Sequence, residues 1–182
     1  MELPKEPWPS DMLDAGENRA EMSHQQYIDY GYIPSYTLLF IFVAVLQSYS
    51  TRQWIWALAP ICIVLALTAA TYDLVENRGI LAVTELRDDS AWALIRPAAL
   101  VKWACAYLII LFQAPFYLTV LLRGLFAKVI ARAVGLLALA SGGVGFYSSV
   151  TGNEKGIGMA LLPLLVATLA MPLFFWLGRR NA

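Results

Sequence analysis

Long apolar segments separated by short polar ones are the feature that most constrains how this chain can fold. A helix needs about 20 mostly apolar residues to cross a hydrocarbon layer roughly 30 Å thick. Segments that approach this length are residues 32–48, 54–74, 98–122, 129–149 and 157–177. The composition agrees, because 59% of the residues are hydrophobic and only 14% are charged, against roughly a quarter in soluble domains. We therefore predict an all-α, polytopic integral membrane protein with about five transmembrane helices.

The connections between the predicted spans are short, with one exception. Links of a few residues join spans one and two, three and four, and four and five, so these pairs are expected to be antiparallel neighbours. Only the link at 73–97 is long enough for structure of its own, and we expect an interfacial helix around residues 85–94. The bundle, residues 32–178, is predicted to follow a polar, acidic N-terminal tail, 1–31, and to precede a basic C-terminal tail, 179–182.

The charged residues divide between the two sides that five spans define. Every acidic residue falls on the side of the N-terminal tail, whereas the other side carries only basic residues, among them Arg52, Lys128 and Arg132. The positive-inside rule counts only Lys and Arg, and by that count the sides nearly tie. We favour the purely basic side, with the C-terminus, as cytoplasmic, and the N-terminal tail as non-cytoplasmic.

Polar residues interrupt an apolar region at the stretch "TYDLVENRG", Thr71–Gly79. The stretch contributes four polar side chains, namely Asp73, Glu76, Asn77 and Arg78. In a helix the first three share one face, at positions i, i+3 and i+4, and the fourth points away from it. Such a face can bind a cation, hold a proton, or pair with Arg87 or Arg96.

Three interpretations of this polar face remain open. In the first, the helix ends here with Gly79 as its terminator, and the polar groups meet water. In the second, Asp73 and Glu76 are buried and functional, because an ionisable group inside a membrane is expensive and is retained mainly for transport, proton transfer or ligand pairing. In the third, they form a structural ion pair between helices.

Small residues recur along the fourth predicted span and bring helices together. They are Gly135, Ala138, Ser141, Gly142 and Gly145. Small side chains let two helix backbones approach closely, so we predict that this face packs on another helix of the chain, with an oligomer interface as the alternative. Gln47 and Gln113, which lie in or near spans, are interpreted as hydrogen-bonding between helices.

Several classes of chemistry lack the residues they need. His24 is the only histidine and belongs to the N-terminal tail, so paired-histidine haem ligation, histidine-containing catalytic triads and zinc-binding HExxH helices cannot arise within the spans. Cys62 and Cys105 lie in apolar runs and are interpreted as small core residues. We expect no metal and no cofactor, and the formal net charge of zero gives no basic field for nucleic acid.

The leading functional hypothesis is a small polytopic protein without catalytic machinery. It would act as an accessory, assembly or interaction subunit of a membrane complex or homo-oligomer, in contact with membrane lipids. One alternative is a small cation or proton channel or carrier that uses the Asp73, Glu76 and Asn77 face. A further alternative is a membrane-embedded enzyme on a lipid or isoprenoid substrate, with arginines holding a phosphate.

Overall fold

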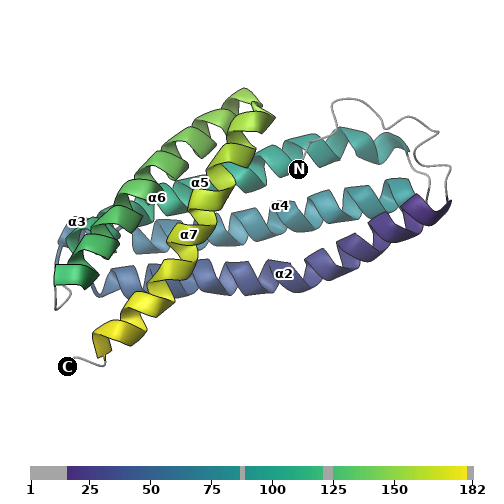
Figure 1. Cartoon of the computed structure of the whole chain (residues 1–182). Coiled ribbons are helices and arrows are strands. Elements are labelled where there is room, and N and C mark those ends of the chain that lie inside the picture. Colours follow the sequence, from purple (N-terminus) through teal and green to yellow (C-terminus); the bar gives the residue numbers. More distant parts are fainter. Residues whose placement is uncertain (1–15, 87–88, 121–124, 180–182) are drawn as a thin grey trace.

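The fold of the chain is given by a computed structural model (Figure 1). The structure describes the backbone of residues 16–86, 89–120 and 125–179, and the side chains of these residues except 16–19, 89, 126, 167, 168 and 170–179. The elements are α2 (Gly16–Ser48), α3 (Gln53–Trp56), α4 (Ala59–Glu85), the 3₁₀ helix η1 (Asp89–Ala91), α5 (Trp92–Thr119), α6 (Leu125–Thr151) and α7 (Glu154–Arg179). No strand occurs in the described ranges.

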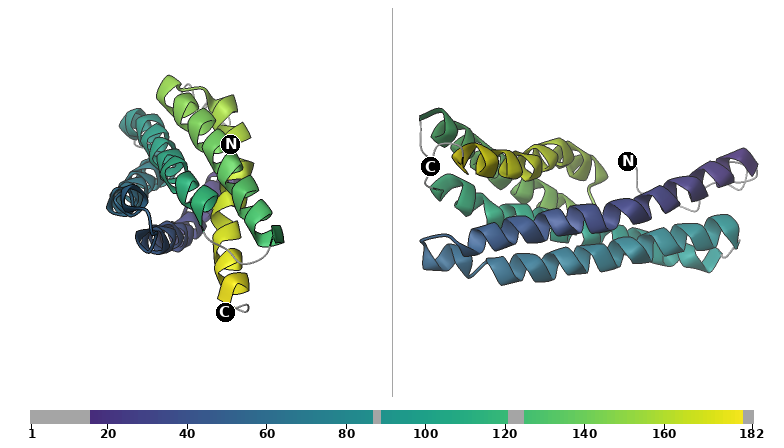
Figure 2. Two further views of the ribbon diagram at one scale, coloured as in Figure 1. Left: turned by 90° about the vertical axis from the view of Figure 1, so that its left-hand side faces the viewer. Right: turned by 90° about the horizontal axis from the view of Figure 1, so that it is seen from below.

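Helices α2, α4 and α5 lie side by side and antiparallel, as the short connections predict (Figure 1). Helix α6 packs along α5, and α7 returns obliquely across the bundle (Figure 2). The main hydrophobic core draws on all five long helices, with Val43, Cys62, Ile110, Ala138 and Leu164 among its buried members. The helices α2, α4, α5 and α7 together line a cavity, which belongs to the candidate functional site.

Four of the helices are long and apolar enough to cross a membrane by length and composition, counting only residues with described side chains. They are Ala20–Ser48, Gln53–Glu85, Trp92–Thr119 and Ala127–Thr151. Their outward side chains include Leu38, Val64 and Leu136, each more than half exposed. The hydroxyls of Thr68 and Thr71 donate to carbonyls one turn back in the same helix, so these outward polar groups need no water. These features are consistent with a polytopic membrane bundle.

The turn between α6 and α7 is encoded in the sequence "TGNEKG". Gly152 has a φ of 67°, a left-handed conformation that glycine adopts without strain. Its N–H donates to Ser149 O, and the N–H of Asn153 donates to Ser148 O, which together form a Schellman stop for α6. Asn153 Oδ1 then accepts the N–H of Gly156 and caps α7. A tight helical hairpin results.

At the end of the bundle where α2 begins and α4 connects to α5, these three helices extend beyond the α6–α7 hairpin (Figures 1 and 2). We call this end acidic and the opposite end basic, after the charged residues predicted on each side. The extension has a small hydrophobic core of its own, centred on Val83, Ala91 and Ile95. Residues 16–31, which we predicted as part of a tail, belong to α2, while residues 1–15 and 180–182 of the predicted tails lie outside the described residues. The amphipathic packing of these three helices on one another explains why helix continues past the apolar segments.

Two predictions for the end of the second span are wrong. Helix α4 does not end at Gly79 but continues to Glu85, because Gly79 is a contact point for α5: a Cβ there would lie 2.8 Å from Ile95 Cγ1. The expected interfacial helix around residues 85–94 is also absent from the described part of this link. A 3₁₀ turn at Asp89–Ala91 leads directly into α5, so α4 and α5 form a hairpin.

Candidate functional site

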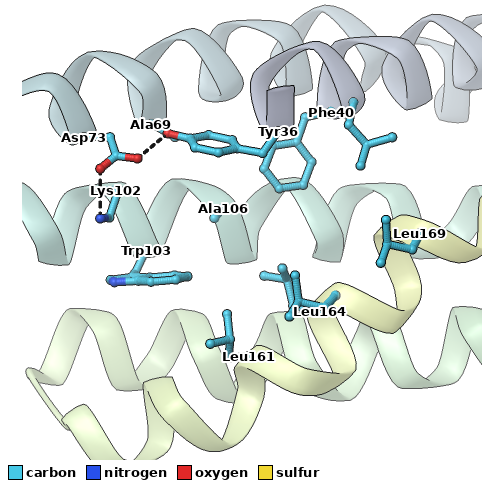
Figure 3. Close-up of a pocket in the computed structure, with 12 residues that line it drawn as sticks. Tyr36, Phe40, Ala69, Asp73, Lys102, Trp103, Ala106, Leu161, Leu164 and Leu169 are labelled. Carbon is cyan, nitrogen blue, oxygen red and sulfur yellow. Dashed lines mark hydrogen bonds and ion pairs between the residues drawn. The ribbon is translucent and has the colours of Figure 1, made fainter. Parts of the chain in front are cut away.

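Lys102 of α5 lies between two carboxylates of α4. Its Nζ donates to Asp73 Oδ1 at 3.0 Å and lies 2.5 Å from Glu76 Oε2. From α2, the hydroxyl of Tyr36 donates to Asp73 Oδ2 at 2.6 Å, so Asp73 bridges two helices (Figure 3). We call this group of four residues, Tyr36, Asp73, Glu76 and Lys102, the lysine layer. It ties α2, α4 and α5 together.

The lysine layer is buried and its charges do not balance. The side chains of Lys102, Asp73 and Glu76 are only 13%, 11% and 5% exposed. Two carboxylates face one ammonium, and Asp29 of α2 adds a third acid that interacts electrostatically with Asp73 and Lys102. Because an uncompensated buried charge is costly, the layer is suited to hold one further positive charge, either a proton or a cation.

A cavity of about 200 Å³ adjoins the lysine layer (Figure 3). Asp73 and Lys102 line its polar end, Phe40 and Trp103 line its sides, and leucines of α7 form the opposite wall. A cavity needs a volume of only roughly 10–15 Å³ to hold a single water molecule, so this one has room for a larger molecule. Among the wall residues, Leu165 and Leu169 are 46% and 63% exposed, so the cavity reaches the outer surface of the bundle beside α7.

Aromatic rings border the charged end of this cavity. Lys102 Nζ lies 5.3 Å from the centroid of the Trp103 ring, which is within the range of a cation–π contact. Tyr36 stacks edge-on against Phe40, with ring centroids 6.1 Å apart. The polar end of the cavity therefore combines carboxylates with electron-rich ring faces.

The residues of the predicted polar face share one side of α4 as expected, but they do not lie at a helix end. Asp73, Glu76 and Asn77 share an inward face and are buried, whereas Arg78 is exposed on the other side. The interpretation that they meet water at a helix end is therefore wrong, since α4 continues and α2 and α5 cover them. Asn77 Nδ2 has no hydrogen-bond partner among the described residues.

The predicted arginine partners do not reach these carboxylates in the described residues. Arg96 lies 3.8 Å from Glu154 at the start of α7 and is 41% exposed. Arg87 lies outside the described residues. The partner in the structure is Lys102, which no sequence pattern described above linked to these carboxylates. The hairpin explains the pairing, because Asp73 and Lys102 lie at similar distances along α4 and α5 from the turn between Glu85 and Trp92.

The small residues of α6 face α5 and α7. A Cβ on Gly142 would lie 2.9 Å from the Cα of Leu111, and one on Gly145 would overlap the ring of Tyr107. Gly135 is equally close to Leu118, and Ala138 is fully buried. Ser141 Oγ donates to the carbonyl of Ala160 at 2.7 Å. These contacts hold the α6–α7 hairpin against α5 and so position the α7 wall of the cavity.

A second buried polar group, the glutamine layer of Gln47 and Gln113, lies closer to the end of the bundle where α2 ends and α3 begins. Gln47 Nε2 donates to Ile55 O at 3.0 Å and to Phe112 O at 3.1 Å, and Gln113 Nε2 lies 3.5 Å from Phe40 O. Both side chains are fully buried. They link α2 to α3 and α5 through backbone carbonyls.

Fold and site together define an all-helical protein with four apolar helices that could span a membrane, and a buried charged cluster beside an apolar cavity. Comparisons with models of known protein families, with curated proteins and with solved structures give no match. The function therefore has to be argued from the site itself.

Proposed function

We propose that this chain is a five-span integral membrane protein that binds one amphiphilic molecule from the bilayer, without catalytic machinery of its own. It would act as a binding or interaction subunit, alone or in a larger membrane assembly. The observation that carries the proposal is the cavity, which has apolar walls from α2, α5 and α7 and a polar end at Asp73 and Lys102. Ligand sites of this shape are mostly apolar and carry a few well-placed polar groups.

The proposal includes five membrane crossings and the orientation of the bundle in the membrane. Helix α7 has 26 residues and an apolar sequence, which is sufficient for a fifth crossing. The apolar outward face of α4 runs from Ile61 to Val75 and stops at Arg78, so the lysine layer would lie inside the protein about one turn below one membrane surface. We keep the basic end as cytoplasmic, which would place the lysine layer nearer the non-cytoplasmic surface.

The packing of the bundle favours binding at one side over passage through it. Between the lysine layer and the basic end, the described core is filled by large side chains such as Tyr107, Ile109 and Ile110, each fully buried. Among the polar side chains described in this region, Gln47, Tyr107 and Gln113 contact backbone carbonyls. A channel or carrier along the Asp73 face would need this core to open.

The arginines also give little support to an enzyme that holds a phosphate. Arg78 points away from the polar face, and Arg96 contacts Glu154 instead of the cavity. The described basic group nearest the cavity is Lys102, whose charge is already shared between two carboxylates. A site for a phosphate monoester would instead gather unpaired basic groups.

Two tryptophan substitutions on α7 test the proposal. Leu164 is 5% exposed and lines the cavity, whereas Leu162 on the same helix is 70% exposed and does not. We expect native mass spectrometry of protein extracted in a neutral detergent to detect one retained amphiphile per chain in the wild type and in Leu162→Trp. Leu164→Trp fills the cavity and should lose it. Equal retention by both variants would contradict the proposal.

A further inference from the structure

We propose that the molecule bound in this cavity is an amphiphilic amine, whose ammonium group meets Asp73 of the lysine layer and whose alkyl body fills the apolar part. This inference rests on the proposed function and names the chemical class of its ligand.

The charge of the lysine layer favours a cation. Lys102 neutralises one of the two carboxylates that contact it. Asp29, which interacts electrostatically with Asp73 and Lys102, adds a further negative charge. One ammonium group would cancel the excess of Asp73 and Glu76 over Lys102. An anionic headgroup would enlarge the excess, and a neutral one would leave it in place.

Asp73 has room for the new contact. A carboxylate offers about four lone-pair positions, and in the described structure Tyr36 and Lys102 take one each. Asp73 is one of the residues that line the cavity, so a ligand there can approach its side chain. The repulsion from Lys102 is reduced because its ammonium is held between Asp73 and Glu76 and above the Trp103 ring.

The walls favour an amphiphile over an inorganic cation. Ring faces attract ammonium groups, and both Tyr36 and Trp103 line the charged end. The rest of the lining is aliphatic or aromatic, including Leu39, Ala106 and Leu161. A small hydrated metal ion would leave this apolar volume unfilled, whereas an alkyl chain would be buried against it.

The experiment compares dodecylamine with 1-dodecanol, which has the same chain and no charge at neutral pH. Each is titrated into purified full-length protein in a neutral detergent, and the bound fraction is measured by native mass spectrometry. We expect the amine to bind about 10-fold more tightly or better, because a hydrogen bond to a charged group is worth more than one between neutral groups. Both probes should bind weakly to Leu164→Trp.

Two variants of α4 separate the headgroup contact from general damage. Glu76→Gln removes one negative charge and keeps the Asp73–Lys102 pair, so the amine affinity should fall about 10-fold while the alcohol affinity changes by less than about 2-fold. Glu85→Gln is the matched control, because Glu85 is exposed near the end of the same helix and bonds only to Tyr27 among the interactions described. It should bind both probes as the wild type does.

The outcomes distinguish the two proposals. Equal affinity for amine and alcohol, or an amine affinity unchanged by Glu76→Gln, would overturn the ammonium inference and leave the cavity as a site for neutral amphiphiles. Such a result would follow if a proton already neutralised the excess charge. Binding of both probes that Leu164→Trp does not weaken would contradict the cavity itself, and with it the proposed function.

Discussion

The lysine layer and the glutamine layer lie about 17 Å apart along α5, from Lys102 to Gln113, and differ in how their polar groups find partners. Gln47 bonds to backbone carbonyls of Ile55 and Phe112, which are fixed by the helices that carry them. Lys102 bonds to two carboxylates on another helix and leaves a formal charge uncancelled. The glutamine layer adjoins packed core, whereas the lysine layer adjoins the cavity.

This difference separates polar groups that hold helices together from polar groups that can also act on a ligand. The Gln47 amide donates to two backbone carbonyls and accepts from the Cys62 thiol, so nothing further is gained by placing a molecule beside it. A buried charged cluster with an unequal number of acids and bases costs stability, and a ligand or proton that restores the balance recovers it. Both layers would be classed as interhelical polar contacts in sequence, but only one is suited to binding.

The largest expected effect comes from removing the base of the lysine layer. Lys102→Met would leave Asp73 and Glu76 buried without a counter-charge, so we expect a loss of about 3–5 kcal/mol in the free energy of unfolding, or failure to accumulate folded protein. Thermal unfolding in neutral detergent, followed by circular dichroism, measures the effect.

A triple variant shows whether charge is the cause. Lys102→Met combined with Asp73→Asn and Glu76→Gln removes both the base and the acids, and should recover much of the lost stability. If the triple variant is no more stable than Lys102→Met, the stem of Lys102 and not its charge is what the bundle needs, and the contrast between the two layers fails.

The next effect concerns the hairpin that builds the cavity wall. Gly142→Leu forces a side chain against the backbone of Leu111, and we expect it to cost about 1–3 kcal/mol or more, because overpacked contacts can relax only by moving the helices apart. Gly143→Leu is the control, since Gly143 is exposed and a Cβ there meets nothing within 4 Å. Both are measured by the same thermal unfolding. Equal loss in the two variants would mean that leucine itself, and not the α5–α6 contact, is responsible.

Sequence reasoning could find the long helices because their apolar segments are long, but it could not find where they end. The mean hydropathy falls before residue 32 and after Asp73, yet α2 begins before the first point and α4 continues past the second. Both helices are longer than their apolar segments because their inward faces pack on each other and on α5. Gly79 resembles a helix terminator in sequence, and only the position of Ile95 shows it to be a contact residue.

The polar face of the candidate site could be predicted from the sequence, but its basic partner and its cavity could not. The spacing of Asp73, Glu76 and Asn77 placed them on one face, because that follows from helical geometry alone. Lys102 was missed as their partner because its position near the start of an apolar run is also what a residue that reaches the membrane surface would have. The cavity depends on how α7 crosses α2 and α5, which no local pattern encodes.

The smallest expected effect comes from the glutamine layer. Gln47→Leu is close in volume and removes the two hydrogen bonds that Nε2 donates to Ile55 O and Phe112 O, together with the weak one that Oε1 accepts from the Cys62 thiol. Interhelical hydrogen bonds in membrane proteins contribute about 0.6 kcal/mol on average, and up to about 1.7, so we expect a loss of about 1–2 kcal/mol in the free energy of unfolding. Amine binding should stay within about 2-fold of the wild type, because Gln47 lies outside the cavity lining. A loss of binding as large as that of Glu76→Gln would mean that the two layers are energetically coupled, and that neither can be assigned a role without the other.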